Sequence, residues 1–218
     1  MSLALFDLDN TLIAGDSDHL WGDFLVAEGL VDPDKHKALN EHYYRQYQQG
    51  QLDIDEYLSF ALGPMAGMTP ETLSALQDKF LKKHVEPILL DAAFDLLQAH
   101  RVNGDTMIII TATNTLVTQP IADRLGVEHL IGCEAELKDG RYTGKPEGVP
   151  SFGEGKVQRI KTWCTEHQIL FEDAVFYSDS HNDLPLLRKV ARAIAVDPDD
   201  PLRVEAQQCG WEIISLRP

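Results

Sequence analysis

The apolar and polar positions along the chain follow two different rhythms. Residues 3–5 form a short apolar run that leads into two carboxylates, Asp7 and Asp9. Such a run predicts a buried strand, and the i, i+2 spacing places both carboxylates on one face of the extended chain. Residues 16–86 instead carry their apolar side chains at helical spacing. From about residue 89 onward, short apolar runs alternate with helical stretches, which predicts a parallel sheet covered by helices on both faces.

The long helical stretch predicts an all-helical insert. Thr69 suits the N-cap of one helix, since Pro70 would then occupy its first turn. We expect residues 16–86 to form a small helical cap inserted after the first strand, and residues 1–15 and 87–218 to form the core. An insert at this position suits a lid over the strand ends. The four expected helices cover 18–28, 33–50, 53–62 and 70 onward.

The alternating part completes the predicted fold class, which is α/β: a doubly wound parallel sheet with a small all-helical cap. A hairpin signal lies around the Asp139-Gly140 turn. Ligands of such sheets bind beyond the carboxyl ends of the strands. Helices are expected over 91–101, 115–125, 155–167, 184–190 and 200–208, and strands over 107–111, 174–178, 193–196 and 212–214.

The charge balance narrows the classes of partner. The 218 residues, 44% of them hydrophobic, suit one substantial core with a smaller appended unit. Lys and Arg number 19 against 35 Asp and Glu, which gives a formal charge of −16. So acidic a surface repels nucleic acid and anionic membranes, and neither is expected as a partner. An anionic substrate would depend on a metal ion or a local cation.

Cysteine spacing and hydropathy predict the compartment. Cys133, Cys164 and Cys209 are scattered and lack metal-site or disulfide spacing, so free thiols in a reducing compartment are expected. The N-terminal residues show no leader pattern, and no apolar stretch approaches the ~20 residues of a membrane span. We expect a cytoplasmic protein, either a monomer or a homodimer.

Polar residues stand where several of the predicted strands end. Because the carboxyl ends of parallel strands meet at one edge, these residues should converge on one pocket. Carboxylates gathered in a partly desolvated pocket repel each other unless a cation shares the site. Mg²⁺ is the expected cation, since it prefers hard oxygen ligands. The converging residues are Asp7, Asp9, Thr111, Asp179 and Asp183, with Lys156 at the start of the helix before the strand at 174–178.

These residues also carry a family resemblance. Residues 7–11, Asp-Leu-Asp-Asn-Thr, resemble the first motif of the haloacid dehalogenase superfamily, DxDxT or DxDxV. Residues 108–112, 155–156 and 178–184 resemble its second, third and fourth motifs, in the family's order. Any one motif is weak, whereas four in order are specific. An insert between the first and second motifs resembles the phosphoserine phosphatase branch.

Two lysines compete for the third motif. Gly144-Lys145 resembles the lysine motif of some relatives, but Lys145 lies 34 positions before Asp179 (179 − 145). Lys156 lies 23 positions before Asp179 (179 − 156), which leaves room for one helix and a turn. Lys156 is therefore preferred, and Lys145 is expected at the surface.

The resemblance implies a phosphomonoester hydrolase that acts on a small metabolite through an aspartyl-phosphate. Asp7 would attack phosphorus, and Asp9 would serve as general acid and then as general base. Thr111 would hydrogen-bond a phosphoryl oxygen, and Lys156 would offset the charge of the nucleophile and the phosphate.

The same resemblance implies a metal site. Mg²⁺ would be held by Asp7, by the backbone carbonyl of Asp9 and by Asp179, with Asp183 in reach directly or through water. The ion would let an anionic nucleophile approach an anionic phosphate. Asn182 would position the substrate or a metal-bound water.

Substrate choice should lie with the insert. Asp16 stands where phosphoserine phosphatases have a Glu for the substrate amine, and Arg45 is the only arginine between Asp16 and Glu86 that could meet a carboxylate. Residues 111–113 read Thr-Ala-Thr where that branch has Ser-Gly-Gly, which places Ala112 near the phosphate. These departures count against phosphoserine itself.

A small amine-bearing phosphomonoester such as histidinol phosphate suits Asp16 without needing the arginine. His19 and Trp21 could stack on an imidazole ring, although both are also ordinary packing residues. The tyrosines of the insert are expected in its core rather than at a ligand: Tyr43, Tyr44 and Tyr47.

Other interpretations remain. A phosphotransferase would use the same aspartyl-phosphate with an acceptor alcohol in place of water. A non-catalytic metal-binding or phosphate-binding protein could share the fold, although the motif carboxylates and the lysine are intact. Dehalogenation is disfavoured because it needs neither Asp9 nor Mg²⁺. Taken singly, each motif also suits a strand followed by a capped turn.

Overall fold

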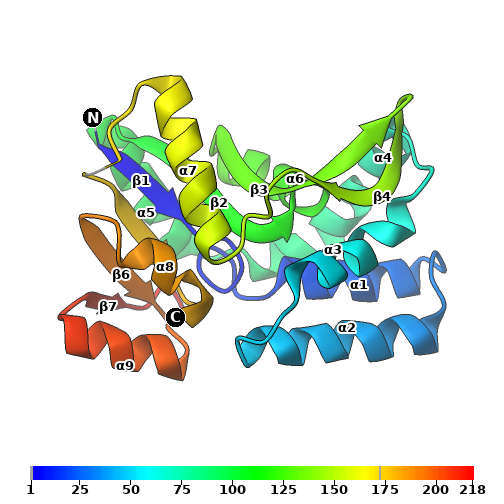
Figure 1. The fold of residues 1–218 in the computed structure, drawn as a ribbon, viewed down its shortest axis with the longest axis horizontal. Helices are drawn as coiled ribbons and strands as arrows, with labels where there is room; N and C mark the ends of the chain where they lie inside the picture. The colour runs from blue at the N-terminus through cyan, green and yellow to red at the C-terminus, as the bar shows by residue number, and fades with distance from the viewer. Residues whose placement is uncertain (1, 172) are drawn as a thin grey trace.

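The computed structural model describes residues 2–171 and 173–218 and places a seven-stranded sheet at the centre of the fold (Figure 1). The strand order is β4-β3-β2-β1-β5-β6-β7, and every neighbouring pair is parallel except β3 with β4. The α/β fold class is therefore the predicted one. The strands are β1 Leu3–Phe6, β2 Thr106–Asn114, β3 His129–Lys138, β4 Arg141–Glu147, β5 Val175–Ser178, β6 Arg192–Val196 and β7 Glu212–Ile214.

Helices fill the connections. Between β1 and β2 run α1 Ser17–Ala27, α2 Pro33–Gln48, α3 Ile54–Leu62 and α4 Pro70–Phe80, with short turns η1 Gly63–Met65, η2 Leu81–Val85 and η3 Glu86–Ile88. The remaining helices are α5 Asp91–Asn103, α6 Thr115–Leu125, α7 Glu154–His167, the turn η4 His181–Asp183, α8 Leu184–Leu187 and α9 Asp200–Cys209.

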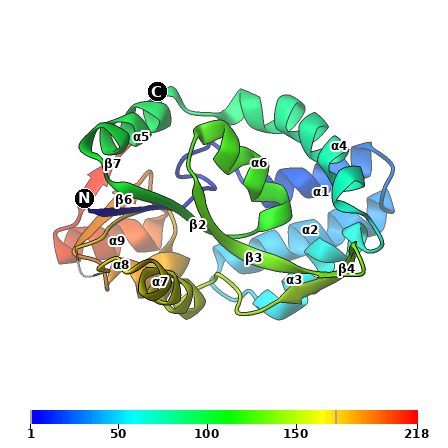
Figure 2. The same ribbon diagram turned by 90° about the horizontal axis from the view of Figure 1, so that it is seen from above.

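The two faces of the sheet bury separate apolar clusters. Along β1, Ala4 and Phe6 pack into the cluster shared with α5 and α6, whereas Leu3 and Leu5 pack into the cluster shared with α7 and α9. Figure 2 shows α5 and α6 on one side of β2 and α7 on the other. A strand covered on both faces needs apolar residues at every position, which is why residues 3–6 lack polar alternation.

The helical insert shares the first of these clusters. Trp21 and Phe24 of α1, together with Leu73 of α4, belong to the same buried cluster as Phe6. The segments that join insert and sheet run side by side, since Ile13 bridges Leu89. The division into a core and a cap at residues 16 and 86 stays a prediction.

The hairpin of β3 and β4 reaches the insert (Figure 1). The backbone N–H of Tyr142 donates to the carbonyl of Met68 (3.0 Å), and the guanidinium of Arg141 donates to the carbonyl of Gly67 (2.7 Å). These contacts connect the far end of the sheet to the turn before α4.

Most element boundaries agree with the sequence expectations. The Thr69 hydroxyl caps α4 by accepting the N–H of Thr72, and α6 spans the predicted residues. Three expectations need correction. The strand expected over 107–111 continues to Asn114 as β2, so Thr111 lies within the strand rather than at its end, because the chain pairs with β3 again at Asn114 after the register shift. The helix expected over 184–190 ends at Leu187, because the chain turns to enter β6 at Arg192. The hairpin strand β3 begins at His129, where it pairs parallel with β2, because an apolar run interrupted by Gly132 gives little strand signal.

Candidate active site

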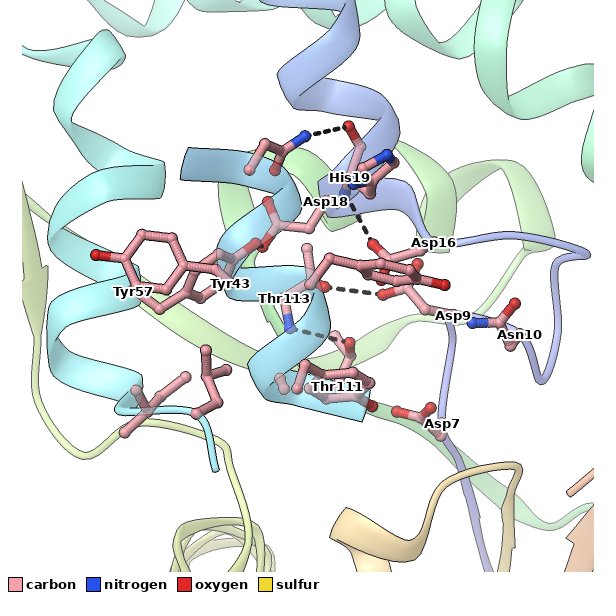
Figure 3. Close-up of a pocket in the computed structure, with 16 residues that line it drawn as sticks. Asp7, Asp9, Asn10, Asp16, Asp18, His19, Tyr43, Tyr57, Thr111 and Thr113 are labelled. Carbon is pink, nitrogen blue, oxygen red and sulfur yellow. Dashed lines mark hydrogen bonds between the residues drawn. The ribbon is translucent and has the colours of Figure 1, made fainter. Parts of the chain in front are cut away.

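A pocket lies beyond the carboxyl end of β1 and beside the last residues of β2, against α1, α2 and α3 (Figure 3). The volume inside it that is open to water-sized molecules is about 50 Å³, so the pocket is narrow in this structure. Its polar lining comes from both the sheet and the helical insert. The lining includes Asp7, Asp9, Asp16, Asp18, His19, Thr111, Ala112, Thr113 and the tyrosines Tyr43, Tyr44, Tyr47 and Tyr57.

Asp7, Lys156 and Asp183 form a buried charge cluster at the end of β1. The ammonium of Lys156 lies 2.9 Å from Oδ1 of Asp7 and 2.7 Å from Oδ1 of Asp183, and Lys156 is 2% exposed. Burial alone would lower the pKa of Lys156, but the charges of Asp183 and Asp7 outweigh it and raise that pKa. The lysine therefore stays protonated. Lys145 is exposed, as expected.

One ammonium does not balance the neighbouring carboxylates. Burial, with the charge of Asp183 acting in the same direction and Lys156 opposing both, raises the pKa of Asp7 to about 7. Burial and the charges of Asp7 and Asp183 raise the pKa of Asp179 well above its ordinary value. The Asp179 carboxylate accepts a hydrogen bond from the Thr11 hydroxyl (3.1 Å). The cluster is short of positive charge.

This donor set suits a hard divalent cation. Asp7 and Asp179 present carboxylate oxygens at adjacent strand ends, since β1 and β5 pair side by side. Among the described residues, no three acidic, histidine or cysteine side chains form a group that could hold a metal ion. A cation here would rest on two carboxylates, a backbone carbonyl and water, which is the mixed coordination that Mg²⁺ prefers. The Asp183 carboxylate already pairs with the Lys156 ammonium and accepts a hydrogen bond from the Ser178 hydroxyl (2.7 Å).

Both carboxylate oxygens of Asp9 accept hydrogen bonds. The backbone N–H of Ser17 donates to Oδ1 (2.6 Å), and the Thr113 hydroxyl donates to Oδ2 (2.8 Å; Figure 3). Burial and the charge of Asp16 raise the pKa of Asp9 to about 6, although these hydrogen bonds act in the opposite direction. A carboxyl that titrates near neutrality can both release and take up a proton.

Thr111 is oriented by the backbone. Its hydroxyl oxygen accepts the N–H of Thr113 (3.1 Å), and the side chain is 1% exposed at the floor of the pocket. Because that lone pair is occupied, the hydroxyl hydrogen is free to point to another acceptor in the pocket. Ala112 also lines the pocket, beside the two threonines.

The insert side of the pocket is acidic and aromatic. Asp16 caps α1 by accepting the N–H of His19 (2.8 Å), and the His19 ring lies 5.0 Å from that of Tyr44. The Asp18 carboxylate accepts the Tyr57 hydroxyl (2.7 Å), and burial raises the pKa of Asp18 to about 7.

Sequence reasoning missed part of this wall. Tyr43, Tyr44 and Tyr47 were expected in the core of the insert but line the pocket, as do Asp18 and Tyr57. The available signal was the sequence of residues 33–48, in which charged and amide residues surround the tyrosines and few residues are apolar. On a helix this polar, tyrosines at i, i+1 and i+4 mark a face that covers something other than an apolar core.

Three proposed substrate contacts do not line this pocket, although Asn182 lines a neighbouring one that also contains Asp179. Arg45 is exposed and does not line the pocket. It follows Tyr44 directly, and successive side chains of a helix point in different directions, so Arg45 lies on another face of α2. Trp21 is 1% exposed and packs against Phe24 and Phe80. The Asn182 amide donates to the carbonyl of Tyr47 (3.1 Å), so it joins α2 to the loop after β5.

The sequence model of the haloacid dehalogenase-like hydrolases matches residues 4–188, which is most of the chain. The chain belongs to this family. It is 41% identical over 220 residues to the histidinol-phosphatase of Neisseria meningitidis serogroup C (strain 8013), a match that covers 99% of each protein.

Solved structures share this fold. The structure of a protein with unknown function from Bordetella pertussis Tohama I superposes with a TM-score of 0.93 and 42% identity over 99% of both chains. A phosphoserine phosphatase solved as an analogue of its phospho-aspartyl intermediate superposes with a TM-score of 0.69 over 99% of this chain and 93% of the other. At 18% identity, the latter supports the fold alone.

Several predictions are confirmed at this level. The chain is a haloacid dehalogenase-like hydrolase with the expected α/β fold, and it is a phosphatase enzyme. Phosphatases of this family generally use a divalent metal, and the phosphatase relatives act on small phosphomonoesters. Within residues 2–171 and 173–218, no helix is both long and apolar enough to cross a bilayer.

Proposed function

We propose that this protein is a Mg²⁺-dependent phosphomonoester hydrolase that acts through an aspartyl-phosphate on a small amine-bearing metabolite of the histidinol phosphate type. One observation carries the proposal. The buried cluster of Asp7 and Lys156, with Asp9 beside it, opens into a pocket whose insert wall holds two further carboxylates and four tyrosines. Among the described residues lining this pocket there is no Lys or Arg.

The chemistry begins at Asp7. Its carboxylate oxygen attacks phosphorus, the bond from phosphorus to the alcohol oxygen breaks, and that oxygen takes a proton from Asp9. Water then attacks the aspartyl-phosphate and gives a proton to Asp9, which restores the Asp7 carboxylate and releases phosphate. Lys156 stays protonated beside Asp7 and offsets charge, while the Thr111 hydroxyl donates to a phosphoryl oxygen.

The cation would complete the charge balance. Asp7, Asp179 and the backbone carbonyl of Asp9 would hold Mg²⁺, with Asp183, which pairs with Lys156, in reach directly or through water. When bound, the ion supplies positive charge that lowers the repulsion between the Asp7 carboxylate and the phosphate. The excess of negative charge around Lys156 supports this assignment.

The wall of the insert supports a cationic substrate. The carboxylate of Asp16 and the aromatic faces of Tyr43 and Tyr44 suit an ammonium or imidazolium group. Phosphoserine would also bring a carboxylate into an acidic pocket, and Arg45 lies outside that pocket. The relative at 41% identity is named a histidinol-phosphatase, which favours the same substrate class.

The insert would act as a cap that selects the substrate. Residues 16–86 contribute Asp16, Asp18 and the tyrosines, whereas the nucleophile and the proposed metal ligands stand at the ends of β1 and β5. In this arrangement the sheet edge carries out the reaction, and the insert covers the active site and selects the substrate, as lids do in other enzymes.

The test is phosphate release from matched esters. Histidinol phosphate, phosphoserine and a neutral alkyl phosphate are compared with Mg²⁺ and with excess chelator. We expect release only with metal, the highest kcat/KM for the amine-bearing ester without a carboxylate, and loss of activity in Asp7→Asn. Equal turnover of neutral and amine-bearing esters would refute the substrate class, and full activity of Asp7→Asn would refute the mechanism.

A further inference from the structure

Thr113 is a polar residue at a position where the phosphoserine phosphatase branch has glycine. It lies on β2, lines the pocket and is 6% exposed. Its hydroxyl donates a 2.8 Å hydrogen bond to Oδ2 of Asp9 (Figure 3). Glycine at this position could not make that bond, so the contact depends on the Thr113 side chain.

The hydrogen bond completes a two-point clamp. The backbone N–H of Ser17, at the start of α1, donates to the other oxygen of Asp9 (2.6 Å). With one oxygen held from the insert side and the other from β2, the carboxyl group cannot rotate about its last torsion without breaking a hydrogen bond. The clamp therefore sets the direction in which Asp9 presents a proton.

The place of Thr113 does not depend on its hydroxyl. Its backbone N–H donates to the Thr111 hydroxyl oxygen. Its backbone carbonyl lies close to Gly132 of β3, since a Cβ added to that glycine would come within 2.8 Å of the carbonyl oxygen. Packing thus holds the backbone on both sides. Removing the hydroxyl while keeping the side-chain shape should release Asp9 and leave the strand in place.

We propose that Thr113 is a positioning residue that holds Asp9 against the leaving oxygen of the substrate. This inference rests on the proposed function, in which Asp9 is the general acid. As the bond from phosphorus to oxygen breaks, its electron pair stays on the leaving oxygen, which takes the proton from Asp9. The carboxylate left behind accepts the Thr113 hydrogen bond more strongly than the acid did, so the bond favours the transition state.

Leaving groups of different basicity test this role. An alkoxide needs a proton as it leaves, whereas p-nitrophenolate is a stable anion that leaves without one. In Thr113→Val we expect kcat/KM for an alkyl phosphomonoester to fall by about 10–100-fold, as part of the effect of general acid catalysis. The value for p-nitrophenyl phosphate should change by less than about threefold. Thr113→Ser keeps the hydroxyl and should retain most of the activity on both esters.

Two variants serve as controls. Thr115→Val makes the same chemical change two residues away, where the hydroxyl bonds Glu134 instead of Asp9 (2.9 Å), and should leave both esters unaffected. Asp9→Asn removes the acid itself and should penalise the alkyl ester far more than the aryl ester.

The outcomes separate the two levels of the proposal. Selective loss in Thr113→Val with rescue by Thr113→Ser supports the positioning role. If Thr113→Val lowers both esters equally, or neither, while Asp9→Asn stays selective, the positioning role is refuted and the general acid stands. If Asp9→Asn itself shows no selectivity, the general acid assignment fails and the role of Thr113 falls with it.

Discussion

The ammonium of Lys156 offsets the negative charge of the carboxylates buried at the strand ends. It is the ammonium that contacts both Asp7 and Asp183 inside a nearly solvent-free cluster. Burying a carboxylate without a partner is costly, and breaking a buried ion pair commonly costs about 3–5 kcal/mol. The residue is thus expected to serve stability as well as catalysis.

Lys156→Met should abolish phosphate release and lower the free energy of unfolding by about 3–5 kcal/mol, because two buried carboxylates lose their counter-charge. Urea unfolding followed by circular dichroism measures the stability, and single-time-point phosphate release measures the activity. The matched control is Lys145→Met, which changes an exposed lysine that competes for the same motif in the sequence. If both variants behave alike, Lys156 does not have this role.

Asp18 gives a pH dependence whose sign can be worked out. Burial raises the pKa of Asp18 to about 7 in the folded protein, against about 3.9 for an unfolded aspartate. Between these values the folded state binds more protons than the unfolded state. The contribution of Asp18 to stability is therefore largest below pH 4 and is lost as the pH rises through 7.

Asp18→Asn removes this titration while keeping an oxygen that can accept the Tyr57 hydroxyl. The stability of the variant relative to the natural protein should increase as the pH rises from 4 to 7, by at most about 1.4 kcal/mol per pH unit, and level off above pH 7. Urea unfolding at a series of pH values checks this. A difference independent of pH would show that Asp18 is ionised throughout the range.

At the scale of elements, two close backbone approaches position the site. The register between β2 and β3 shifts after Ile110, and Gly132 of β3 lies against the Thr113 carbonyl at the shift. Gly155, in the first turn of α7, lies so close to Pro150 that an added Cβ would meet its carbonyl oxygen at 2.0 Å. Because Lys156 follows Gly155 directly, this contact fixes the backbone position from which the Lys156 side chain extends to Asp7.

Gly155→Ala should shift the first turn of α7, lower the melting temperature and reduce kcat by at least about tenfold, because Lys156 moves with the turn. Differential scanning fluorimetry and phosphate release measure the two effects. Gly63→Ala is the control, since a Cβ at Gly63 meets nothing within 4 Å and its φ is an ordinary −49°. Wild-type activity in Gly155→Ala would mean that the loop before α7 adjusts freely.

At the scale of the whole molecule, the pocket is built from parts far apart in the sequence. Residues of the insert share one buried cluster with the sheet, the β3–β4 hairpin contacts the turn before α4, and Asn182 reaches the carbonyl of Tyr47. The insert is therefore anchored at three places around the pocket. A cation bound among the uncompensated carboxylates at its centre would therefore stabilise this assembly.

Removal of divalent metal should abolish activity and make the protein less stable. At a free Mg²⁺ concentration 100 times its dissociation constant, binding to the folded state alone adds about 2.7 kcal/mol to the unfolding free energy. Melting temperatures with Mg²⁺ and with excess chelator measure this shift. In Asp179→Asn the shift should disappear. An equal shift in the variant would place the cation elsewhere.

The sequence by itself determined the order and type of most elements and the residues at the strand ends. Apolar runs and capping residues act locally, so β1, α4 and α6 could be predicted from neighbours in the chain. The carboxylates of the first and fourth motifs could be placed together because parallel strands end at a common edge.

Only the tertiary structure decided the wall that faces the substrate. Whether Tyr44 or Arg45 points into the pocket depends on the rotation of α2 against α1 and α3, and helical spacing leaves that rotation open. The hydrogen bonds from Thr113 to Asp9 and from Tyr57 to Asp18 join residues 104 and 39 positions apart. Such contacts have no local pattern, because they form only after sheet and insert have packed.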